Sequence, residues 1–511
     1  MRIYIRGFDT PYTYRFIEKI AVSLKPEGIV FIHDPQHYPD RPRLNLPAGI
    51  DFEELNVEDV VNGHLGFPEE DAETLSKEFI HEHLELEMTA VRLMDRIDQR
   101  DFGGHIRRKH YYLMLLRSFR HLLKIKKITH FISHALPHHP IDFIPYELSR
   151  RAGLSCVYFE RTPVLGTVYL AQDWREEGLD FFNRAQRIKA DASLASSIEL
   201  RKDFEDHFKM QTGSELPKYF HIDLYHKQLR DSKKTLNKIK GRLADTGNKI
   251  RNLLDHPKRA IQKYFTVDFW YLNKYTVKKE TLKLHKYYQS ISIEADLTKK
   301  YVYFPLHLQP EATTCPQGDV FVDQQLAIRI ISASIPKDWL IYVKEYPGQL
   351  ADGRNIGFYK DLLELKNLRF VKVSTVSAEL IASSQAVATI TGTAGWEALF
   401  RGKPVLFFGH CYYQYAPGVF KISSEQNCRA AIKAFSEGAK PNLHDLRIFL
   451  KAIQDGSIIG YVEPRFGQAN ILPAEENSEN LARAYVDFVR SESNGLNTKK
   501  DFSSQVQTVR T

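Results

Sequence analysis

Short apolar segments alternate with amphipathic segments along most of the chain, and this alternation restricts the possible folds more than any other feature. In the first part of the sequence the apolar segments are RIYIRG, GIVFIHD, ITHFISH and LSCVYFE, and helical patterns lie between them at TYRFIEKIAVSL and IDFIPYELSRRAG. Strands that alternate with helices predict a parallel sheet with crossover helices. We therefore expect an α/β domain over residues 1–220.

A second series of the same kind begins near Lys299. Its apolar segments are KKYVYFPL, WLIYVKEYP, LRFVKV, AVATITG and KPVLFFG, and its helical patterns are DQQLAIRIISAS and SAELIASS. We expect a second α/β domain over residues 299–475, a helix over 476–492 and a disordered tail over 493–511. A chain of 511 residues is too long for one hydrophobic core, which agrees with two domains.

The segment between the two series is strongly basic. From Lys227 to Lys286 it contains about 17 Lys and Arg residues and about 5 acidic residues, with apolar residues at roughly helical spacing. We expect a basic helical insertion over residues 221–298, and two interpretations of it stay open. It is either a solvated insertion or a contact with an anionic membrane surface, where each Lys or Arg contributes about 1 kcal/mol. Nucleic acid is not expected, because the aromatic residues cluster near Tyr264 to Tyr271 instead of alternating with the basic ones.

Other classes of protein are excluded by composition. The four cysteines lie far apart without a CxxC pair, which predicts neither a disulfide framework nor a zinc site. No stretch has the ~18 consecutive apolar residues that a spanning helix requires, and no charged-then-apolar leader opens the sequence. We expect a cytoplasmic protein, either free or peripheral on the inner face of the cytoplasmic membrane.

The segment ATITGTAGWEALF contains an apolar strand that stops at Thr391-Gly392-Thr393 and a helix that begins directly after it. A turn between the carboxyl end of a strand and a helix presents N–H groups to a ligand, and the helix dipole there favours an anion such as phosphate. Gly392 and Gly395 are expected to let the ligand approach the backbone. Glu397, one helical turn later, is expected to accept hydrogen bonds from a ribose. An ordinary helix cap followed by a solvated glutamate is the alternative.

Two further strand ends in the second series carry polar residues. The segment PLHLQPEATT follows a predicted strand and includes His307 and Glu311, more hydrogen-bonding groups than a simple connection needs. The segment VKEYPG places Lys344 and Tyr346 at the end of the next strand, where a lysine can neutralise a phosphate. A surface charge pair is the alternative for Lys344. Because the carboxyl ends of parallel strands meet at one edge, all three segments are expected at one cleft.

The segments FPLHLQPEATT, GDVFVDQ, KEYP and TGTAGWEALFRGKPVLFFG together resemble the capsule polysaccharide biosynthesis family of glycosyltransferases. The resemblance covers residues 301–420 and implies the GT-B fold, in which two Rossmann-like domains with parallel sheets face a cleft. The family includes transferases similar to those that move Kdo from CMP-Kdo, and is distantly similar to CDP-glycerol glycerophosphotransferases. The chain departs from related transferases at Tyr346-Pro347, where they have His-Pro.

The resemblance also implies roles for individual residues. Thr391, Gly392, Thr393 and Glu397 would bind the donor nucleotide. His307 and Glu311 would lie near its sugar and phosphates, and both are candidate catalytic residues. Glycosyltransferases of this fold stabilise the leaving nucleotide with a helix N-terminus and basic side chains. No DxD triplet occurs in the chain, which agrees with a metal-independent reaction and with the absence of a cofactor.

An inverting transferase also needs a general base on the acceptor side, which is the first domain. His134 and Glu160 lie at the ends of two predicted strands there, and we select them as candidates from a group that also includes His138, His139 and Asp142. A metal site formed by the three histidines is not expected, because acidic or cysteine partners at metal-binding spacing are missing.

The sequence therefore predicts a glycosyltransferase that moves a sugar, including a CMP-linked one, from a nucleotide-sugar donor to a surface polysaccharide or lipid-linked glycan. Three alternatives stay open: a CDP-polyol phosphotransferase, a nucleotide-sugar epimerase and a non-catalytic glycan-assembly module. The donor sugar, the acceptor, the stereochemical outcome and the oligomeric state are not determined by these patterns.

Overall fold

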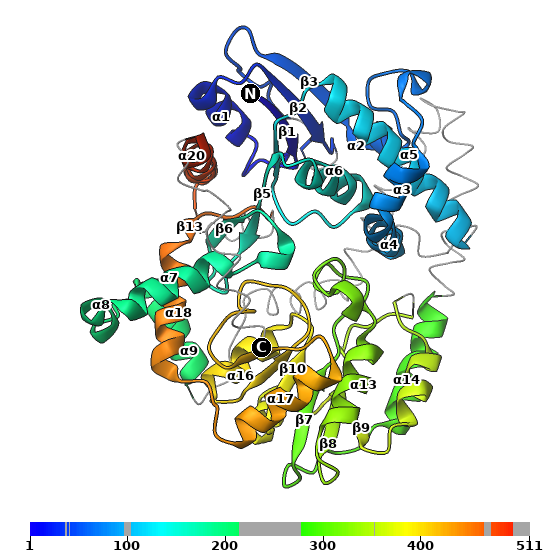
Figure 1. The fold of residues 1–511 in the computed structure, drawn as a ribbon, viewed down its shortest axis with the longest axis vertical. Coiled ribbons are helices and arrows are strands. Elements are labelled where there is room, and N and C mark those ends of the chain that lie inside the picture. Colours follow the sequence, from blue (N-terminus) through cyan, green and yellow to red (C-terminus); the bar gives the residue numbers. More distant parts are fainter. Residues whose placement is uncertain are drawn as a thin grey trace, which may run out of the picture.

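The computed structural model describes residues 1–35, 38–39, 41–96, 104–213, 277–351, 353–463 and 472–493. The chain forms two α/β halves, each built around one sheet, which lie one above the other in Figure 1. Most of the basic segment and the predicted disordered tail fall outside the described residues, so the predictions made for them stay predictions.

The first half contains a seven-stranded sheet with the order β13-β6-β5-β4-β1-β2-β3. Strands β5, β4, β1, β2 and β3 are parallel to one another, and β6 and β13 are antiparallel at one edge. The strands are β1 (Arg2–Arg6), β2 (Gly28–His33), β3 (Asp51–Asn56), β4 (His130–Ser133), β5 (Ser155–Arg161), β6 (Thr167–Ala171) and β13 (Ile458–Ile459). Successive residues of β1 are buried on opposite faces, as expected for a parallel sheet that is covered on both sides.

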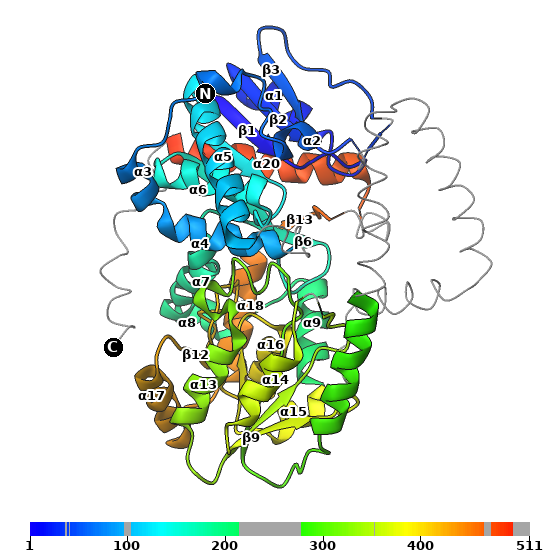
Figure 2. The same ribbon diagram turned by 90° about the vertical axis from the view of Figure 1, so that its right-hand side faces the viewer.

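Helices cover both faces of the first sheet. The α4, α5 and α6 helices pack on one face, and α1 and α20 pack on the other (Figures 1 and 2). In the described part of the region from Asp71 to Lys124, the chain forms several separate helices. The elements of this half are α1 (Phe16–Leu24), α2 (Val57–Val61), η1 (Glu69–Asp71), α3 (Lys77–Glu82), α4 (Leu84–Leu93), η2 (Met94–Arg96), α5 (Gly104–Ile125), α6 (Pro140–Arg151) and α20 (Ala474–Ser493).

The second half contains a six-stranded parallel sheet with the order β12-β11-β10-β7-β8-β9. The strands are β7 (Tyr301–Pro305), β8 (Leu340–Lys344), β9 (Leu368–Val371), β10 (Ala386–Thr389), β11 (Val405–Phe407) and β12 (Val419–Lys421). Each strand that was predicted in this half is present. Two α/β domains with mainly parallel sheets confirm the predicted GT-B class.

Helices also cover both faces of the second sheet. Residues 277–291, α13, α14 and α17 pack on one face, and α15 and α16 pack on the other. The elements of this half are η4 (Asp319–Val322), α13 (Gln324–Ser334), α14 (Ile356–Leu363), α15 (Ser377–Ser383), α16 (Thr393–Phe400), α17 (Glu425–Ser436) and α18 (Leu443–Asp455).

The two halves share a continuous apolar core. The segment that follows β6 in the sequence forms η3 (Trp174–Glu176), α7 (Leu179–Ala190), α8 (Ala192–Ser196) and α9 (Lys202–Thr212). The α18 helix of the second half packs against α7 and α9. The chain then returns to the first half, because β13 joins the first sheet and α20 packs against α1. This return begins before the predicted domain boundary at residue 475. In the described part of the chain, no helix combines the length and the apolar character needed to cross a membrane.

Candidate active site between the two halves

Each sheet has a point where the helices that follow two neighbouring strands lie on opposite faces. In the first sheet these strands are β1, which leads to α1, and β4, which leads to α6. In the second sheet they are β7, which leads to α13, and β10, which leads to α16. A crevice opens outside the carboxyl ends of such strands, and ligands of α/β proteins bind there. We call these places the first and second switch points.

The second switch point brings together two segments that were predicted separately. His307 follows β7, and its Nε2 atom lies 2.9 Å from the Thr389 hydroxyl at the end of β10. The Thr391 N–H donates to the same Nε2 atom at 3.4 Å, and the Thr391 hydroxyl donates to the carbonyl of Thr313 at 2.7 Å. The turn before α16 is therefore fastened to the loop after β7 by side-chain hydrogen bonds.

These bonds correct part of the predicted phosphate cradle. The N–H groups of Thr391 and Gly392 were expected to be unpaired, but they donate to His307 and, at 3.0 Å, to the Thr389 hydroxyl. The first N–H groups of α16, at Thr393 and Ala394, are the ones that helix geometry leaves available for an anion. Thr393 is exposed at this helix start.

Gly395 has a different role from the predicted one. It is buried, and a Cβ atom there would lie 2.6 Å from the Tyr413 hydroxyl and 2.9 Å from Cγ2 of Thr389. The absence of a side chain at this position lets α16 pack closely on β10. Packing of the helix, and not the approach of a ligand, accounts for this glycine.

His307 is enclosed by the protein. Its N–H donates to the side-chain carbonyl of Gln324 at 2.8 Å, and its own carbonyl accepts a hydrogen bond from Arg354 at 2.8 Å. Burial, assisted by the Arg354 charge, lowers the pKa of His307 to about 4. The imidazole is thus neutral near pH 7 and acts as a fixed link between the two segments, which differs from the predicted catalytic position.

Arg354 is the centre of a buried polar network behind His307. Its guanidinium forms an ion pair with Glu345, and both side chains are almost completely buried. Tyr359 donates to the same carboxylate, and the hydroxyl of Tyr288 accepts a hydrogen bond from the Glu345 N–H at 3.0 Å. This network rigidly supports the loop after β7.

Lys344 and Glu397 lie on the α15–α16 side of the second sheet. The ammonium group of Lys344 donates to the Thr375 carbonyl at 2.5 Å and to the Ser377 hydroxyl at 2.9 Å, and burial lowers its pKa. Tyr303 donates to Ser377 at 3.2 Å, and burial raises the pKa of Tyr303 with a further contribution from the Glu397 charge. Glu397 is half-buried. Tyr346, by contrast, is 39% exposed.

The first switch point places His134 directly after β4. A Cβ atom at Gly7, after β1, would lie only 1.8 Å from Nδ1 of His134, and Gly7 has a φ of +74°. Only glycine suits this position, because it tolerates the positive φ and leaves room for the imidazole. Nδ1 of His134 is buried and has no hydrogen-bond partner among the described residues. Burial lowers the pKa of His134, while the charge of Asp9 raises it less.

Charged residues surround His134. The Nε atom of Arg6 lies 2.5 Å from Asp142, and its Nη1 atom lies 4.0 Å from Asp9. Burial alone would raise the pKa of Asp142, but the Arg6 charge and hydrogen bond hold it below its ordinary value. His138 and His139 lie beside this group with rings 5.0 Å apart, and burial lowers the pKa of both.

Glu160 lies on β5, in a different neighbourhood from His134. Burial raises its pKa, and its charge in turn raises the pKa of Glu177, which burial already places well above its ordinary value. Glu177 is buried where the halves meet, and it accepts hydrogen bonds from Tyr158 at 2.6 Å and from Gln317 at 3.1 Å. The two predicted bases, His134 and Glu160, therefore lie in different surroundings. Glu160 interacts with Glu177, which is buried where the halves meet.

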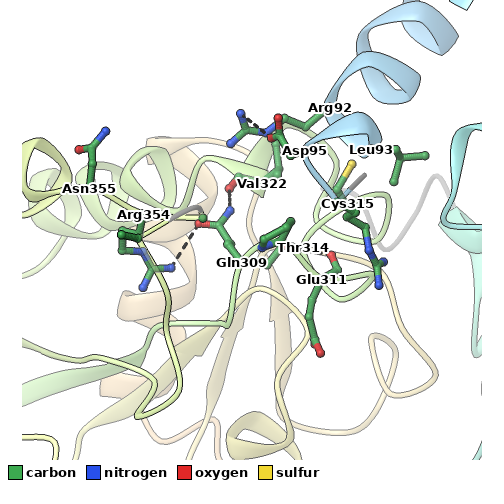
Figure 3. Close-up of a pocket in the computed structure, with 14 residues that line it drawn as sticks. Arg92, Leu93, Asp95, Gln309, Glu311, Thr314, Cys315, Val322, Arg354 and Asn355 are labelled. Atoms are coloured by element: carbon green, nitrogen blue, oxygen red, sulfur yellow. Dashed lines mark hydrogen bonds and ion pairs between the residues drawn. The ribbon is translucent and has the colours of Figure 1, made fainter. Parts of the chain in front are cut away.

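A pocket of about 270 Å³ lies between the halves, near the second switch point (Figure 3). The first half contributes residues from the end of α4 and from η2, and the second half contributes the loops after β7 and β8. Its polar lining includes Arg92, Asp95, Arg96, Gln309, Glu311, Thr314 and Arg354. Of the predicted site residues, only Glu311 lines this pocket. In Figure 3 its carboxylate points away from the pair formed by Arg92 and Asp95.

Sequence patterns did not identify Arg96, Arg354 or Glu177. Arg96 lies in VRLMDRIDQR, which looks like an ordinary charged helix, and Arg354 lies in a polar loop. Their importance depends on contacts between segments that are distant in the chain. The only signal in the sequence was the concentration of polar residues in the loop after β7, which Arg354 supports.

Comparison with known families supports the resemblance. Residues 271–449 match the family described as capsule polysaccharide biosynthesis protein. This range includes His307, Glu311, Lys344 and the turn before α16. The predicted family resemblance is thus confirmed for this part of the chain. No curated protein matches the sequence.

Solved structures with a partial likeness include a beta Kdo transferase, a UDP-GlcNAc 2-epimerase and a sucrose-phosphate synthase. The beta Kdo 2,7 transferase KpsC of Thermosulfurimonas dismutans is 11% identical, with 72% of this chain and 88% of that chain covered and a TM-score of 0.29. The UDP-GlcNAc 2-epimerase of Methanocaldococcus jannaschii is 11% identical, with 85% and 92% covered and a TM-score of 0.22. The sucrose-phosphate synthase of Thermosynechococcus elongatus is 9% identical, with 96% and 100% covered and a TM-score of 0.25. With TM-scores this low, no residue role is transferred from these proteins.

Proposed function

We propose that the chain is a glycosyltransferase that moves a sugar from a nucleotide-sugar donor to a surface polysaccharide or a lipid-linked glycan. The observation that carries the proposal is a pocket lined by both halves, with most of its residues in the segment that matches the capsule family. A transferase must hold donor and acceptor side by side and keep water away from the reacting bond. A pocket between two α/β domains suits this requirement.

The donor nucleotide is placed against α16 in this proposal. Its phosphates would lie at the first N–H groups of the helix, near Thr393, where the helix dipole stabilises negative charge. Glu397, half-buried on the same helix, would accept hydrogen bonds from the ribose. Lys344 and Tyr303 both donate to the Ser377 hydroxyl on the same side of the sheet, and Lys344 would add positive charge there. A CMP-linked sugar is one of the donors that the proposal includes.

The acceptor is placed at the first switch point. His134 is our candidate for the general base, since a neutral imidazole can accept the proton of a sugar hydroxyl. Burial favours the neutral form of His134 near pH 7, and its buried Nδ1 atom has no partner in the described part of the chain. Glu160 is the second candidate, because its raised pKa makes it a better proton acceptor than an ordinary carboxylate.

Metal independence and membrane attachment are also parts of the proposal. Transfer should continue when EDTA is added, because α16 and basic side chains would stabilise the leaving nucleotide.

A lipid-linked acceptor would be reached by docking on an anionic membrane surface. Co-sedimentation with anionic but not neutral liposomes, at low salt only, is the expected behaviour.

A nucleotide-binding experiment tests the function. The full chain is screened by thermal shift against CMP, CDP, UDP, GDP and ADP, because a ligand that binds the folded state raises its stability. The best ligand is then titrated calorimetrically into the wild type, Glu397→Gln and the control Glu379→Gln, an exposed residue of α15. Glu397→Gln should weaken binding by about 1.5–3 kcal/mol, and the control should not change it. If no nucleotide binds to the wild type, the transferase proposal fails.

A further inference from the structure

The pocket between the halves contains arginine side chains that are paired with protein groups to different extents. Arg92 lies 3.1 Å from Asp95, and the same carboxylate lies 2.6 Å from Arg108 of α5. Arg354 forms its ion pair with Glu345, in the interior of the second half. Arg92 and Arg354 are thus each paired with a carboxylate of the described residues.

Arg96 is satisfied to a smaller degree. Its Nη1 atom is buried and has no hydrogen-bond partner among the described residues. Burial lowers the pKa of Arg96, and the charge of Glu311, on the opposite half, raises it by a smaller amount. A buried guanidinium N–H without a partner is costly, so its retention in a pocket indicates that a ligand supplies the missing acceptor.

The position of Arg96 connects the two parts of the site. Its charge contributes to the lowered pKa of His138 and His139 at the first switch point. It also interacts with Glu311, which belongs to the loop after β7. A group bound at Arg96 would therefore lie between the predicted acceptor side and the predicted donor side.

We propose that this pocket is an oxyanion subsite in which Arg96, assisted by Arg92, binds a phosphate or carboxylate group of the sugar substrate. The guanidinium fork matches the two oxygens of such a group. Glu311 repels the anion from the opposite wall, so the anion is seated on the arginine side. The inference rests on the proposed function, because it assumes that a sugar substrate occupies the pocket.

The shared chemistry can come from two sources. One is the phosphate of a nucleotide-linked sugar, and the other is the carboxylate of an acidic sugar. Inorganic pyrophosphate represents the first source and glucuronate the second. The two probes are titrated calorimetrically, at low ionic strength, into the full chain.

The variants are Arg96→Gln, Arg96→Lys and the control Arg107→Gln, an exposed residue of α5. The wild type should bind one of the two anions. Arg96→Gln should lose at least about tenfold in affinity and Arg96→Lys should fall between, because lysine keeps the charge without the fork. Arg107→Gln should bind like the wild type. The melting temperature of Arg96→Gln should not fall strongly, since the Nη1 atom of Arg96 satisfies no hydrogen-bond acceptor among the described residues.

The outcomes distinguish the two proposals. Equal affinity in the wild type and Arg96→Gln, or no binding of either anion by the wild type, overturns the subsite. If Arg96→Gln does not fold, the same decision is taken from Arg96→Lys against Arg107→Gln. If an anion binds at Arg96 while no nucleotide binds to the wild type, the subsite stands and the transferase proposal fails.

Discussion

The two switch points contain the same kinds of residues, but the histidine at each one has different hydrogen-bond partners. At each one a histidine follows a strand and faces a glycine: His134 faces Gly7, and His307 faces Gly392. In the second half Nε2 of His307 contacts Thr389 and Thr391. In the first half Nδ1 of His134 is buried without a partner among the described residues.

This difference indicates which histidine supports the structure and which one is suited to a chemical step. A polar group that is fully hydrogen-bonded within the protein is rigid and has little capacity left for a substrate. A buried polar group without a partner costs stability, and such groups are typical of functional sites. His307 therefore supports the turn before α16, and His134 is the better candidate for the proposed general base.

Arg354→Ala should destabilise the second half strongly. The substitution leaves the buried Glu345 carboxylate without its ion pair, and breaking a buried pair costs about 3–5 kcal/mol. Urea unfolding measures the change. Arg369→Ala, at an exposed position of β9, should stay within about 0.5 kcal/mol of the wild type. A loss below about 1 kcal/mol for Arg354→Ala would show that the network does not support the fold.

His134→Asn should lower the rate of sugar transfer by about 10² or more with little change in stability. The reason is that a general base contributes a factor of about 10²–10⁴, while the imidazole satisfies no described polar group through Nδ1. The rate is measured with the donor that the nucleotide screen identifies. His110→Asn, exposed on α5, serves as the control. A normal rate would remove His134 from the reaction and leave Glu160 as the candidate.

His307→Ala should have the opposite profile. Thr389 and Thr391 lose their shared partner inside the protein, so the free energy of unfolding should fall by about 1–3 kcal/mol. Any loss of transfer rate should be accompanied by this loss of stability. A large loss of rate at unchanged stability would contradict the comparison, because it would return His307 to the catalytic group.

Glu177→Gln should change how stability depends on pH. The folded state holds a proton on Glu177 that the unfolded chain releases near its ordinary pKa of about 4.3, so the stability from this group is complete below that pH and is lost as pH rises. Between pH 5 and pH 6 the wild type should lose about 1 kcal/mol relative to Glu177→Gln. Urea unfolding at both values measures this difference.

The control for that experiment is Glu437→Gln, which changes an exposed carboxylate at the end of α17. It should show the same pH dependence as the wild type. A constant difference between the wild type and Glu177→Gln at both pH values would mean that Glu177 is ionised in the joint between the halves.

The sheets and the strand ends could be predicted from the sequence because they depend on local patterns. Apolar runs such as those around Ile3, Tyr303 and Val387 each form a strand, and polar residues follow β7 and β10 as predicted. The internal pairing of His307 with Thr391 was not predictable, since it depends on two strands becoming neighbours. The same reason applies to Gly395, whose packing against Tyr413 depends on a later segment of the chain.

The residues of the joint were still less accessible to prediction. The role of Glu177 depends on its hydrogen bonds with Tyr158 and Gln317, which belong to opposite halves. Arg96 looks like one of many helix charges until its surroundings in the folded pocket are known. Sequence patterns report periodicity along one segment, and these sites are created by contacts between segments.

The return of the chain to the first half has a consequence for synthesis on the ribosome. The apolar side chains of α1, including Ile17 and Ile20, pack with Leu481 and Tyr485 of α20. They therefore emerge from the ribosome well before the helix that covers them. The second sheet, by contrast, has all of its strands once β12 has been made. The half that is synthesised first is thus the half that is completed last, and until then it exposes an apolar surface of the kind that chaperones bind.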